Sequence, residues 1–261
     1  PIQAAYDLGD LLPYTELVFP LPEDQELLPE LVNREPTFTF VPDVGGDGTQ
    51  VRESHLASTT PTRLNESPGS QFDGNAESTS NVINFISEDG VASLQVNGVV
   101  ISAGGLPLAV ATDAAGTLTI TAYTFDAATG AGSISYTYTL NDNTGATAGS
   151  EVSFPLVITD PQGDSAADVL TIRIIDDSPE AFDNTDSVTE GGTATGNVLT
   201  DQEVDIFGAD GPKGTTPAGG VIGVRAAGGD TTTEVVGGTG TVITGQYGTL
   251  TLNGDGSYTY V

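Results

Sequence analysis

The stretch GTLTITAYTFDAATGAGSISYTYTL, residues 116–140, decides the fold class. Apolar and polar side chains alternate in both of its halves, which is the pattern of a half-buried β-strand. A glycine-containing turn separates the halves, with Gly130 to Gly132 near its tip. The stretch therefore predicts an antiparallel hairpin of two long strands.

Two further hairpins flank this one. VASLQVNGVVI (91–101) alternates on both sides of Asn97-Gly98, a strong signal for a two-residue turn. EVSFPLVITDPQGDSAADVLTIRII (151–175) reads as two strands that turn at Pro161 to Asp164. Because no helical period lies between these short strands, the pattern predicts a β-sandwich.

The chain also contains an internal repeat. Three short matches recur in the same order: VRE and VTE at 51–53 and 188–190, GTLT at 116–119 and 248–251, and SYTY at 135–138 and 257–260. Self-similarity of this kind is the signature of tandem units. We therefore predict one sandwich over residues 36–178 and a related, shorter one over 179–261.

Residues 1–35 differ from the rest, because Leu and Pro alternate there with Glu and Asp. Pro13, Pro20, Pro22 and Pro29 exclude a long helix or a central strand over most of this segment. We expect an extended Pro-rich acidic arm or linker. Its apolar stretch Leu17 to Leu21 is expected to pack on a domain or on a neighbouring chain.

The second unit is expected to be incomplete at its C-terminal end. In the first unit the chain runs on from Ser135 to Asp176, whereas only four residues follow Ser257. An unpaired sheet edge exposes N–H and C=O groups. Either the natural chain continues, or a foreign strand fills the gap. The arm is a candidate donor, since ELVFPL (16–21) resembles EVSFPL (151–156), although its prolines argue against this role.

The composition restricts the partners. The chain has 36 acidic residues against 6 Lys and Arg, a formal charge of −30, which repels nucleic acid and anionic membranes and suits cations. With 37% apolar residues it is not a disordered acidic tail. Cysteine is absent, which excludes thiolate metal sites. No apolar run reaches the length of a membrane span, so we expect no direct membrane insertion.

The stretch IIDDSPEA (174–181) places two carboxylates at the end of a strand, at the predicted junction of the two units. Calcium takes six to eight oxygen ligands, so several carboxylates must converge to hold it. We expect the acids of the 160–164 turn to lie at the same end as the opening strand and the junction. The calcium candidates are Glu53, Asp160, Asp164, Asp176 and Asp177 in the first unit, and Glu190, Asp201 and Asp205 in the second, where Asp210 belongs to the same spaced acidic loop. The alternative is that these are solvated turn acids.

Catalytic chemistry is not expected. His55 is the single histidine, and a Ser-His-acid triad would have to use it. It follows Glu53 and Ser54 in a predicted strand or strand end, where neighbouring side chains point to opposite faces. Glycoside hydrolysis requires two carboxylates that face each other across a cleft. Asp176 and Asp177 are instead neighbours in the chain, at the predicted junction. We therefore predict that the protein is not an enzyme.

At these residues the sequence resembles a known family. TDPQGDSAADVLTIRIIDDSPEA (159–181) and VGGDGTQVRESHL (44–56) resemble the end and the start of the long Ig-like repeats of type I-secreted RTX adhesins. GNVLTDQEVD (196–205) and YGTLTLNGDGSYTYV (247–261) resemble the VCBS or cadherin-like repeats of the same proteins. The resemblance covers residues 36–261. The family commonly has a denser run of Asp than NVLTDQEVDIFGADG (197–211), so this chain departs from the pattern at its second metal site.

The resemblance implies an all-β protein of tandem Ig-like/cadherin-like β-sandwich domains. It implies a calcium-stabilised structural spacer of a bacterial cell-surface adhesin, extracellular and used in attachment or biofilm formation. Its partners would be neighbouring domains of the same polypeptide or neighbouring subunits. Three alternatives stay open: a subunit of an extracellular filament assembled by donor-strand complementation through residues 1–35, a polysaccharide- or protein-binding module, and an accessory domain of a secreted hydrolase.

Overall fold

The computed structural model describes residues 33–57, 68–112, 115–144, 150–212, 219–225 and 236–261. It is an all-β structure with short 3₁₀ turns at Glu53–His55 and Ala103–Gly105. The predicted arm over residues 1–35 lies, except for its last three residues, outside the described residues. The fold class predicted from alternation is confirmed.

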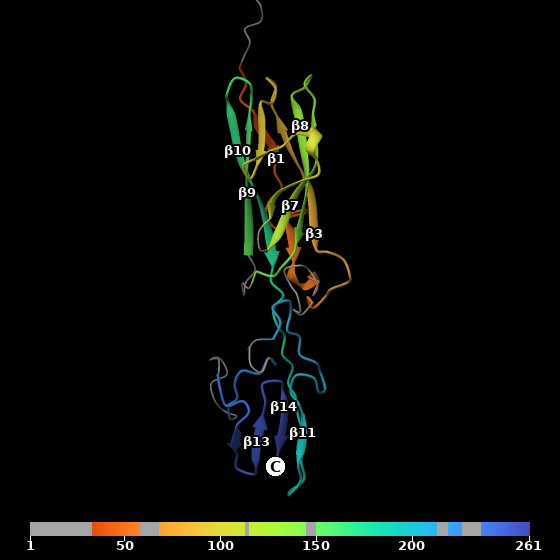
Figure 1. Cartoon of the computed structure of the whole chain (residues 1–261), viewed down its shortest axis with the longest axis vertical. Helices are drawn as coiled ribbons and strands as arrows, with labels where there is room; N and C mark the ends of the chain where they lie inside the picture. Colours follow the sequence, from red (N-terminus) through yellow and green to blue (C-terminus); the bar gives the residue numbers. More distant parts are fainter. Residues whose placement is uncertain (1–32, 58–67, 113–114, 145–149, 213–218, 226–235) are drawn as a thin grey trace, which may run out of the picture. The chain divides into compact units, whose positions relative to one another are not determined.

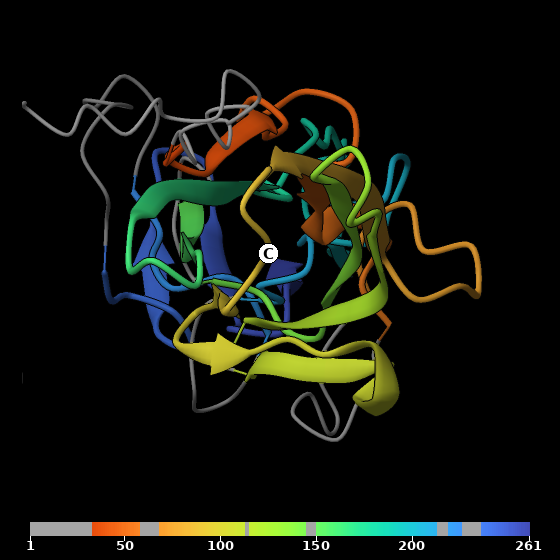
Figure 2. The same ribbon diagram turned by 90° about the horizontal axis from the view of Figure 1, so that it is seen from above.

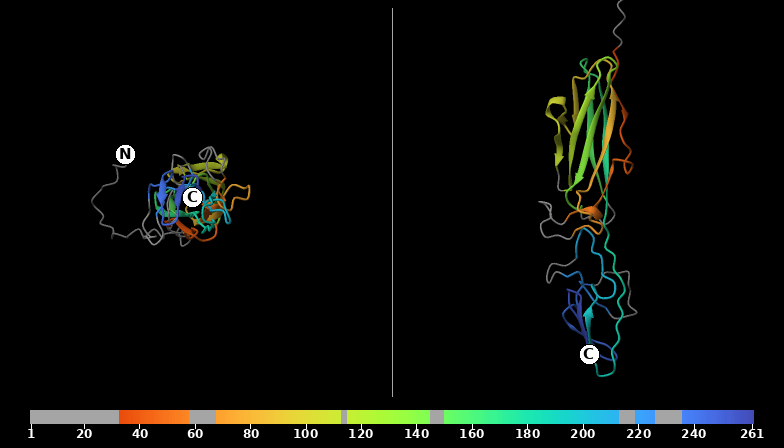
Figure 3. Two further views of the ribbon diagram at one scale, coloured as in Figure 1. Left: turned by 90° about the horizontal axis from the view of Figure 1, so that it is seen from below. Right: turned by 90° about the vertical axis from the view of Figure 1, so that its right-hand side faces the viewer.

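Residues 37–175 form two facing sheets of five strands each (Figures 1 and 3). One sheet has the order β1-β3-β8-β7-β6, with bounds Thr37–Phe40, Ser78–Ile86, Ala131–Leu140, Gly116–Phe125 and Leu108–Thr112. The other has the order β2-β10-β9-β4-β5, with bounds Gln50–Arg52, Ser165–Ile175, Ser150–Thr159, Ser93–Val96 and Val99–Val100. In the view along the strands, β6 lies at the edge of its sheet beside β7 (Figure 2).

The three predicted hairpins are confirmed. β4 and β5 turn at Asn97 and Gly98, which both have positive φ (52° and 77°), the conformation that a two-residue hairpin turn needs. β7 and β8 pair along their whole lengths, and Gly130 lies in their turn while Gly132 is already part of β8. β9 and β10 turn at residues 160–164.

The core lies between the two sheets and is built from the inward positions of the alternating strands. Apolar side chains at every second residue are almost fully buried: Leu118 and Ile120 on β7, Ile134, Tyr136 and Tyr138 on β8, Phe154, Leu156 and Ile158 on β9, and Leu170, Ile172 and Ile174 on β10. Burial of one such side chain stabilises the fold by about 1.5–3 kcal/mol. The period-2 pattern thus positions both sheets.

The C-terminal residues form a four-stranded sheet in the order β11-β14-β13-β12, with bounds Ala194–Asn197, Ser257–Tyr260, Thr249–Leu252 and Val242–Thr244. Its central hairpin repeats the register of β7 and β8. Leu118 lies opposite Tyr138 in the first sheet, and Leu250 lies opposite Tyr260 in this one. β11 and β12 flank the hairpin as β3 and β6 do in the first unit.

Two of the three sequence matches, GTLT and SYTY, thus also pair as strands in the same register in both units. The third match is not reproduced in the backbone. Val51 is fully buried in β2, whereas Val188 is 40% exposed and lies outside any strand. The described residues of the C-terminal unit contain this one sheet, and a second sheet facing it is not among them.

Candidate functional site at the end of strand β10

The strand pairing brings Glu53 and Asp176 to one edge of a sheet. β2 pairs with β10 in parallel, with Val51 opposite Ile174 and Arg52 opposite Ile175. Because parallel strands end at the same edge, the next residue of each strand, Glu53 and Asp176, emerges at the same place. The prediction that these two acids lie at one end of the sandwich is confirmed.

The Glu53 side chain is buried, with only 1% of the residue exposed. Its Oε1 accepts hydrogen bonds from the backbone N–H of Thr144 (2.7 Å) and from the Thr144 hydroxyl (2.8 Å). Its Oε2 is buried and finds no hydrogen-bond partner among the described residues. A buried carboxylate oxygen without a partner is costly, so this atom is where a cation would be most stabilising.

Asp176 and Asp177 have different surroundings. The Oδ2 of Asp176 accepts a hydrogen bond from the Ser178 hydroxyl (2.6 Å), while its Oδ1 is buried and lacks a partner within the described ranges. Both oxygens of Asp177 are used by Ser70, which donates its N–H (2.8 Å) and its hydroxyl (2.6 Å). Asp177 therefore anchors the loop around Ser70, and Asp176 keeps a free acceptor for a ligand.

A loop of the C-terminal residues, 205–211, reaches the same place. Gly208 has a positive φ of 68° and packs directly on the backbone carbonyl of Asp177. The amide of Asn143 donates a hydrogen bond to the carbonyl of Ala209 (3.0 Å). The carboxylate of Asp210 is close enough to repel that of Glu53. The 205–211 loop thus adds a third acid to the neighbourhood of Glu53.

This environment favours the protonated form of Glu53. Burial raises the pKa of the Glu53 carboxyl above its ordinary value, and repulsion from Asp176 and Asp210 raises it further. The two hydrogen bonds from Thr144 lower the same pKa without cancelling the rise. In the absence of a cation, ionised Glu53 is therefore a destabilising charge.

We expect Glu53→Gln to raise the melting temperature at pH 7 in the presence of a chelator. A carboxyl whose pKa is raised in the folded state stabilises the fold while it is protonated. This contribution is fully present at a pH below the pKa of the unfolded state, and it is lost as the pH rises through the pKa of the folded state. The advantage of the variant over the parent chain should therefore shrink as the pH falls from 7 towards about 4. Circular dichroism melts at several pH values, with Glu203→Gln as an exposed control, check this. An advantage that did not change with pH would contradict it.

The turn acids Asp160 and Asp164 do not join this cluster, and the prediction that they would is wrong. They lie in the turn that opens β10, whereas Asp176 follows its last residue. An 11-residue strand rises about 3.3 Å per residue, so the two groups are separated by roughly 35 Å. A hairpin places its turn and its open end at opposite edges of the sheet.

Asp160 instead organises its own turn. Its Oδ1 accepts hydrogen bonds from the N–H groups of Gln162 (2.9 Å), Gly163 (2.8 Å) and Asp164 (2.9 Å). Its Oδ2 is buried, and the structure gives it no hydrogen-bond partner among the residues it describes. The three N–H donors are the pattern expected of a turn-forming Asp.

The three candidates of the second unit form no group of metal-ligating side chains among the described residues. Asp201 accepts a hydrogen bond from the N–H of Asn197 (2.6 Å), and Asp205 accepts one from the N–H of Phe182 (2.8 Å). Glu190 is exposed in the turn that precedes β11. Asp201 and Asp205 therefore hold local backbone structure.

The fit of a metal ion depends on Glu53, Asp176 and Asp210. Within the part of the chain that the structure describes, no three acidic or histidine side chains form a ready coordination shell. The buried Oε2 of Glu53 and Oδ1 of Asp176 nevertheless supply two free oxygen donors, and oxygen is the donor that calcium prefers. Sequence reasoning missed Thr144 and Ser70, and it assigned Asp210 to the second unit only.

Ser54 and His55 lie in the 3₁₀ turn Glu53–His55, which follows directly on the end of β2, as the predicted strand end allows. The Ser54 hydroxyl lies 3.4 Å from Nδ1 of His55, and the same nitrogen lies 3.9 Å from the Glu77 carboxylate. A catalytic triad needs the acid and the serine on opposite ring nitrogens. The serine and the acid meet at one ring nitrogen here, so this group lacks the geometry of a nucleophile and its base.

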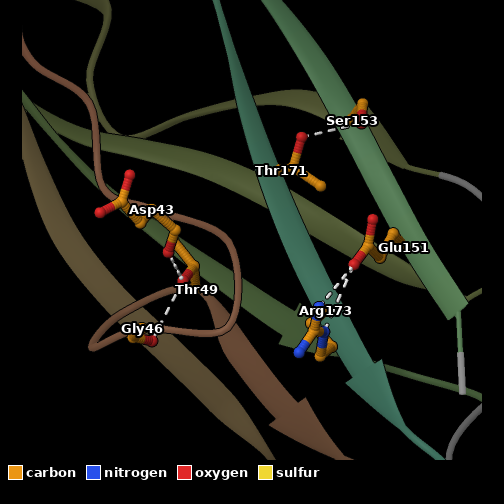
Figure 4. A network of polar contacts seen from close by, with 7 residues as sticks. All are labelled: Asp43, Gly46, Thr49, Glu151, Ser153, Thr171 and Arg173. Atoms are coloured by element: carbon orange, nitrogen blue, oxygen red, sulfur yellow. Dashed lines mark hydrogen bonds and ion pairs between the residues drawn. The ribbon is translucent and has the colours of Figure 1, made fainter.

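The outer face of β9 and β10 carries ordinary cross-strand polar pairs (Figure 4). Arg173 donates to the Oε1 of Glu151 through Nη2 (3.0 Å) and Nε (3.3 Å), and the hydroxyls of Ser153 and Thr171 are 3.0 Å apart. The ion pair is about half exposed, which limits its contribution to about 0–1 kcal/mol. These contacts stabilise the sheet and provide no ligand site.

No protein-family model matches the chain, and no curated protein matches it significantly. Among the described residues, none of the helical segments has the length and apolar character needed to cross a membrane. The function therefore has to be inferred from the chemistry of the site at the end of β10.

Proposed function

We propose that this chain is a calcium-stabilised structural spacer of a bacterial cell-surface adhesin, acting outside the cell in attachment or biofilm formation. In this role it performs no catalysis and projects other parts of the protein from the surface. The all-β fold and the repeated hairpin register support a tandem array. The resemblance of residues 36–261 to adhesin repeats supports the location and the biological role.

The observation that carries the proposal is the pair of buried, unpartnered oxygens, Oε2 of Glu53 and Oδ1 of Asp176. Both belong to acids at the end of β2 and β10, and Asp210 of the 205–211 loop adds a third negative charge. Burying carboxylates together is unfavourable unless a cation or hydrogen bonds compensate them. A bound cation would supply that compensation.

Calcium fits these donors better than magnesium does. Calcium accepts six to eight oxygen ligands in a flexible geometry, whereas magnesium demands a near-ideal octahedron and loses its water reluctantly. Glu53 and Asp176 would hold the ion, with Asp210 as the third acid. Neutralising these charges would fix the 205–211 loop against the end of β10, and removing the ion would leave the acids to repel one another.

We expect calcium to raise the melting temperature of the chain, and Glu53→Gln to abolish most of that gain. Extracellular calcium modules have dissociation constants of about 10⁻⁴–10⁻³ M. At ten times the dissociation constant, one site adds about 1.4 kcal/mol to the free energy of unfolding. Thermal melts in calcium, in magnesium and in chelator test this, with Glu203→Gln as the matched exposed control.

Small-angle scattering under the same conditions shows whether the bound ion restricts the motion of the chain at the end of β10 or binds elsewhere. Calcium should narrow the distribution of dimensions of the parent chain and leave that of the Glu53→Gln variant unchanged. Equal melting temperatures in calcium and in chelator, together with equal dimensions, would refute the calcium site. A gain that Glu53→Gln preserved would move the site away from β10.

A further inference from the structure

The inner face of the C-terminal sheet is less covered than the equivalent face in the first unit. In the first unit, Leu118, Ile120, Tyr136 and Tyr138 are at most 1% exposed. The residues at the same register positions in the second unit are Leu250, Leu252, Tyr258 and Tyr260. Leu252 is buried at 8% exposure, and the other three are only partly buried.

This face is also hollowed. A groove of about 280 Å³ runs between β14 and the segment 186–188 that precedes β11. Its walls are mainly apolar, and its lining residues are Asp186, Ser187, Val188, Ala194, Leu250, Tyr258 and Tyr260. The Tyr258 hydroxyl donates a hydrogen bond to Asp186 (2.5 Å), which fixes one wall.

In the first unit, strand β9 covers the matching surface. Phe154 packs on Tyr138 with ring centroids 5.9 Å apart, and Phe154 and Leu156 are 3% and 0% exposed. Tyr260 holds the register position of Tyr138 but has no aromatic partner of this kind among the described residues. The C-terminal sheet therefore leaves partly uncovered the positions that β9 covers in the first unit.

We infer that the occupant is the segment Glu16–Leu21 of a second copy of this chain. ELVFPL (16–21) matches EVSFPL (151–156) of β9 at four of six positions: Glu, Phe, Pro and Leu. In this alignment Phe19 takes the place of Phe154 and would contact Tyr260. Leu21 takes the place of Leu156.

The prolines of the segment are compatible with this role. Pro155 lies inside β9, opposite Val169, and its carbonyl accepts a hydrogen bond from the N–H of Asn97 (2.7 Å). Pro20 aligns with Pro155, so the pattern that argued against the arm as a donor is present in a strand of the fold itself. Proline also lacks a backbone N–H. A strand that contains Pro20 and Pro22 therefore has fewer backbone N–H groups that would need a hydrogen-bond partner when it lies on a sheet face.

The contact is heterologous, because the segment and the groove are different surfaces of one chain. Repetition of such a contact builds open assemblies in which each copy gives a segment and receives one. Each copy has a formal charge of −30, so the copies repel at low ionic strength. Salt should therefore strengthen the association. This inference is independent of the calcium site at the end of β10.

Analytical ultracentrifugation of the full chain in 0.5 M NaCl, over a hundredfold range of concentration, tests the inference. We expect dimers and larger species that grow with concentration. Phe19→Asp should remove the donor and weaken self-association at least tenfold. Val188→Asp, at a position that is 40% exposed in the groove, should block the acceptor with little risk to folding. Leu12→Asp, in the same arm but outside the segment, is the control and should assemble like the parent chain.

Mixing the two variants gives the decisive result. The Phe19→Asp chain retains the groove and the Val188→Asp chain retains the segment, so together they should form a heterodimer that grows no further. A parent chain that stays monomeric at all concentrations would overturn the inference. The inference would also be overturned if Leu12→Asp weakened self-association as much as Phe19→Asp does. A mixture of the two variants that stays monomeric would overturn it as well, since the segment would then act within its own chain or not at all.

Discussion

Replacing Leu118 with alanine is expected to lower the local free energy of unfolding of the first sandwich by about 3 kcal/mol. Leu118 is fully buried between the sheets, opposite Tyr138. Truncation of a buried leucine removes its transfer free energy and leaves a cavity, with losses of about 2–5 kcal/mol in other proteins. Hydrogen exchange across 116–140 should accelerate by roughly 100-fold.

The matched control is Leu250→Ala, which removes the same atoms at the same register position of the C-terminal sheet. Leu250 is only partly buried, so we expect a smaller loss of about 1 kcal/mol, measured as exchange across 249–260. The comparison uses the repeat itself as the reference, because side chain, strand and opposing tyrosine are all matched. Equal losses at the two positions would contradict the difference in burial.

Replacing Gly208 with alanine is expected to detach the 205–211 loop from the end of β10, with a loss of about 3 kcal/mol. Gly208 has a positive φ, where a non-glycine residue costs roughly 1–2 kcal/mol. A Cβ at this position would also overlap the backbone carbonyl of Asp177, which has no freedom to rotate away. Overpacking of this kind adds about 1–3 kcal/mol.

Gly74→Ala separates the two causes. Gly74 also has a positive φ of 95°, but no described atom lies within 4 Å of the Cβ that alanine would add. This variant should therefore show the backbone cost without the overlap. The melting temperature measures the backbone cost in both variants, and hydrogen exchange of residues 205–211 measures the detachment of the loop, which only Gly208→Ala should accelerate. If Gly208→Ala left that exchange unchanged, as Gly74→Ala is expected to, the packing of Gly208 on Asp177 would be disproved.

The hairpins were predictable because their signals are local. Asn97 and Gly98 adopt the positive φ values that the turn requires, and strand alternation follows directly from the period of two. The repeat was also readable, because register is set by the same alternating residues that recur in sequence. The weakest match, at residues 188–190, is the one that the backbone does not reproduce.

The candidate site was only partly predictable. Glu53 and Asp176 follow strands that end at one edge, which the repeat indicated. The 160–164 turn was placed at the wrong end, although the hairpin predicted over 151–175 already puts a full strand between that turn and the junction. The contacts of Thr144 with Glu53 and of Ser70 with Asp177 join residues 91 and 107 positions apart. No local pattern encodes such distant contacts.

The parallel pairing of β2 with β10 has a mechanical consequence. β2 is an early strand and β10 is the last strand of the first sandwich, and they are hydrogen-bonded neighbours over three residue pairs, 50–52 with 173–175. Tension drawn towards both chain ends would pull these two strands in opposite directions along their common axis. Their hydrogen bonds would then be loaded in shear and would have to break together, whereas a peeling force breaks them one at a time. Resistance to pulling is a rate, set by the barrier to unfolding, so this short ladder, together with the pairing of β1 and β3 that precedes it in the chain, sets how long the first sandwich survives under load.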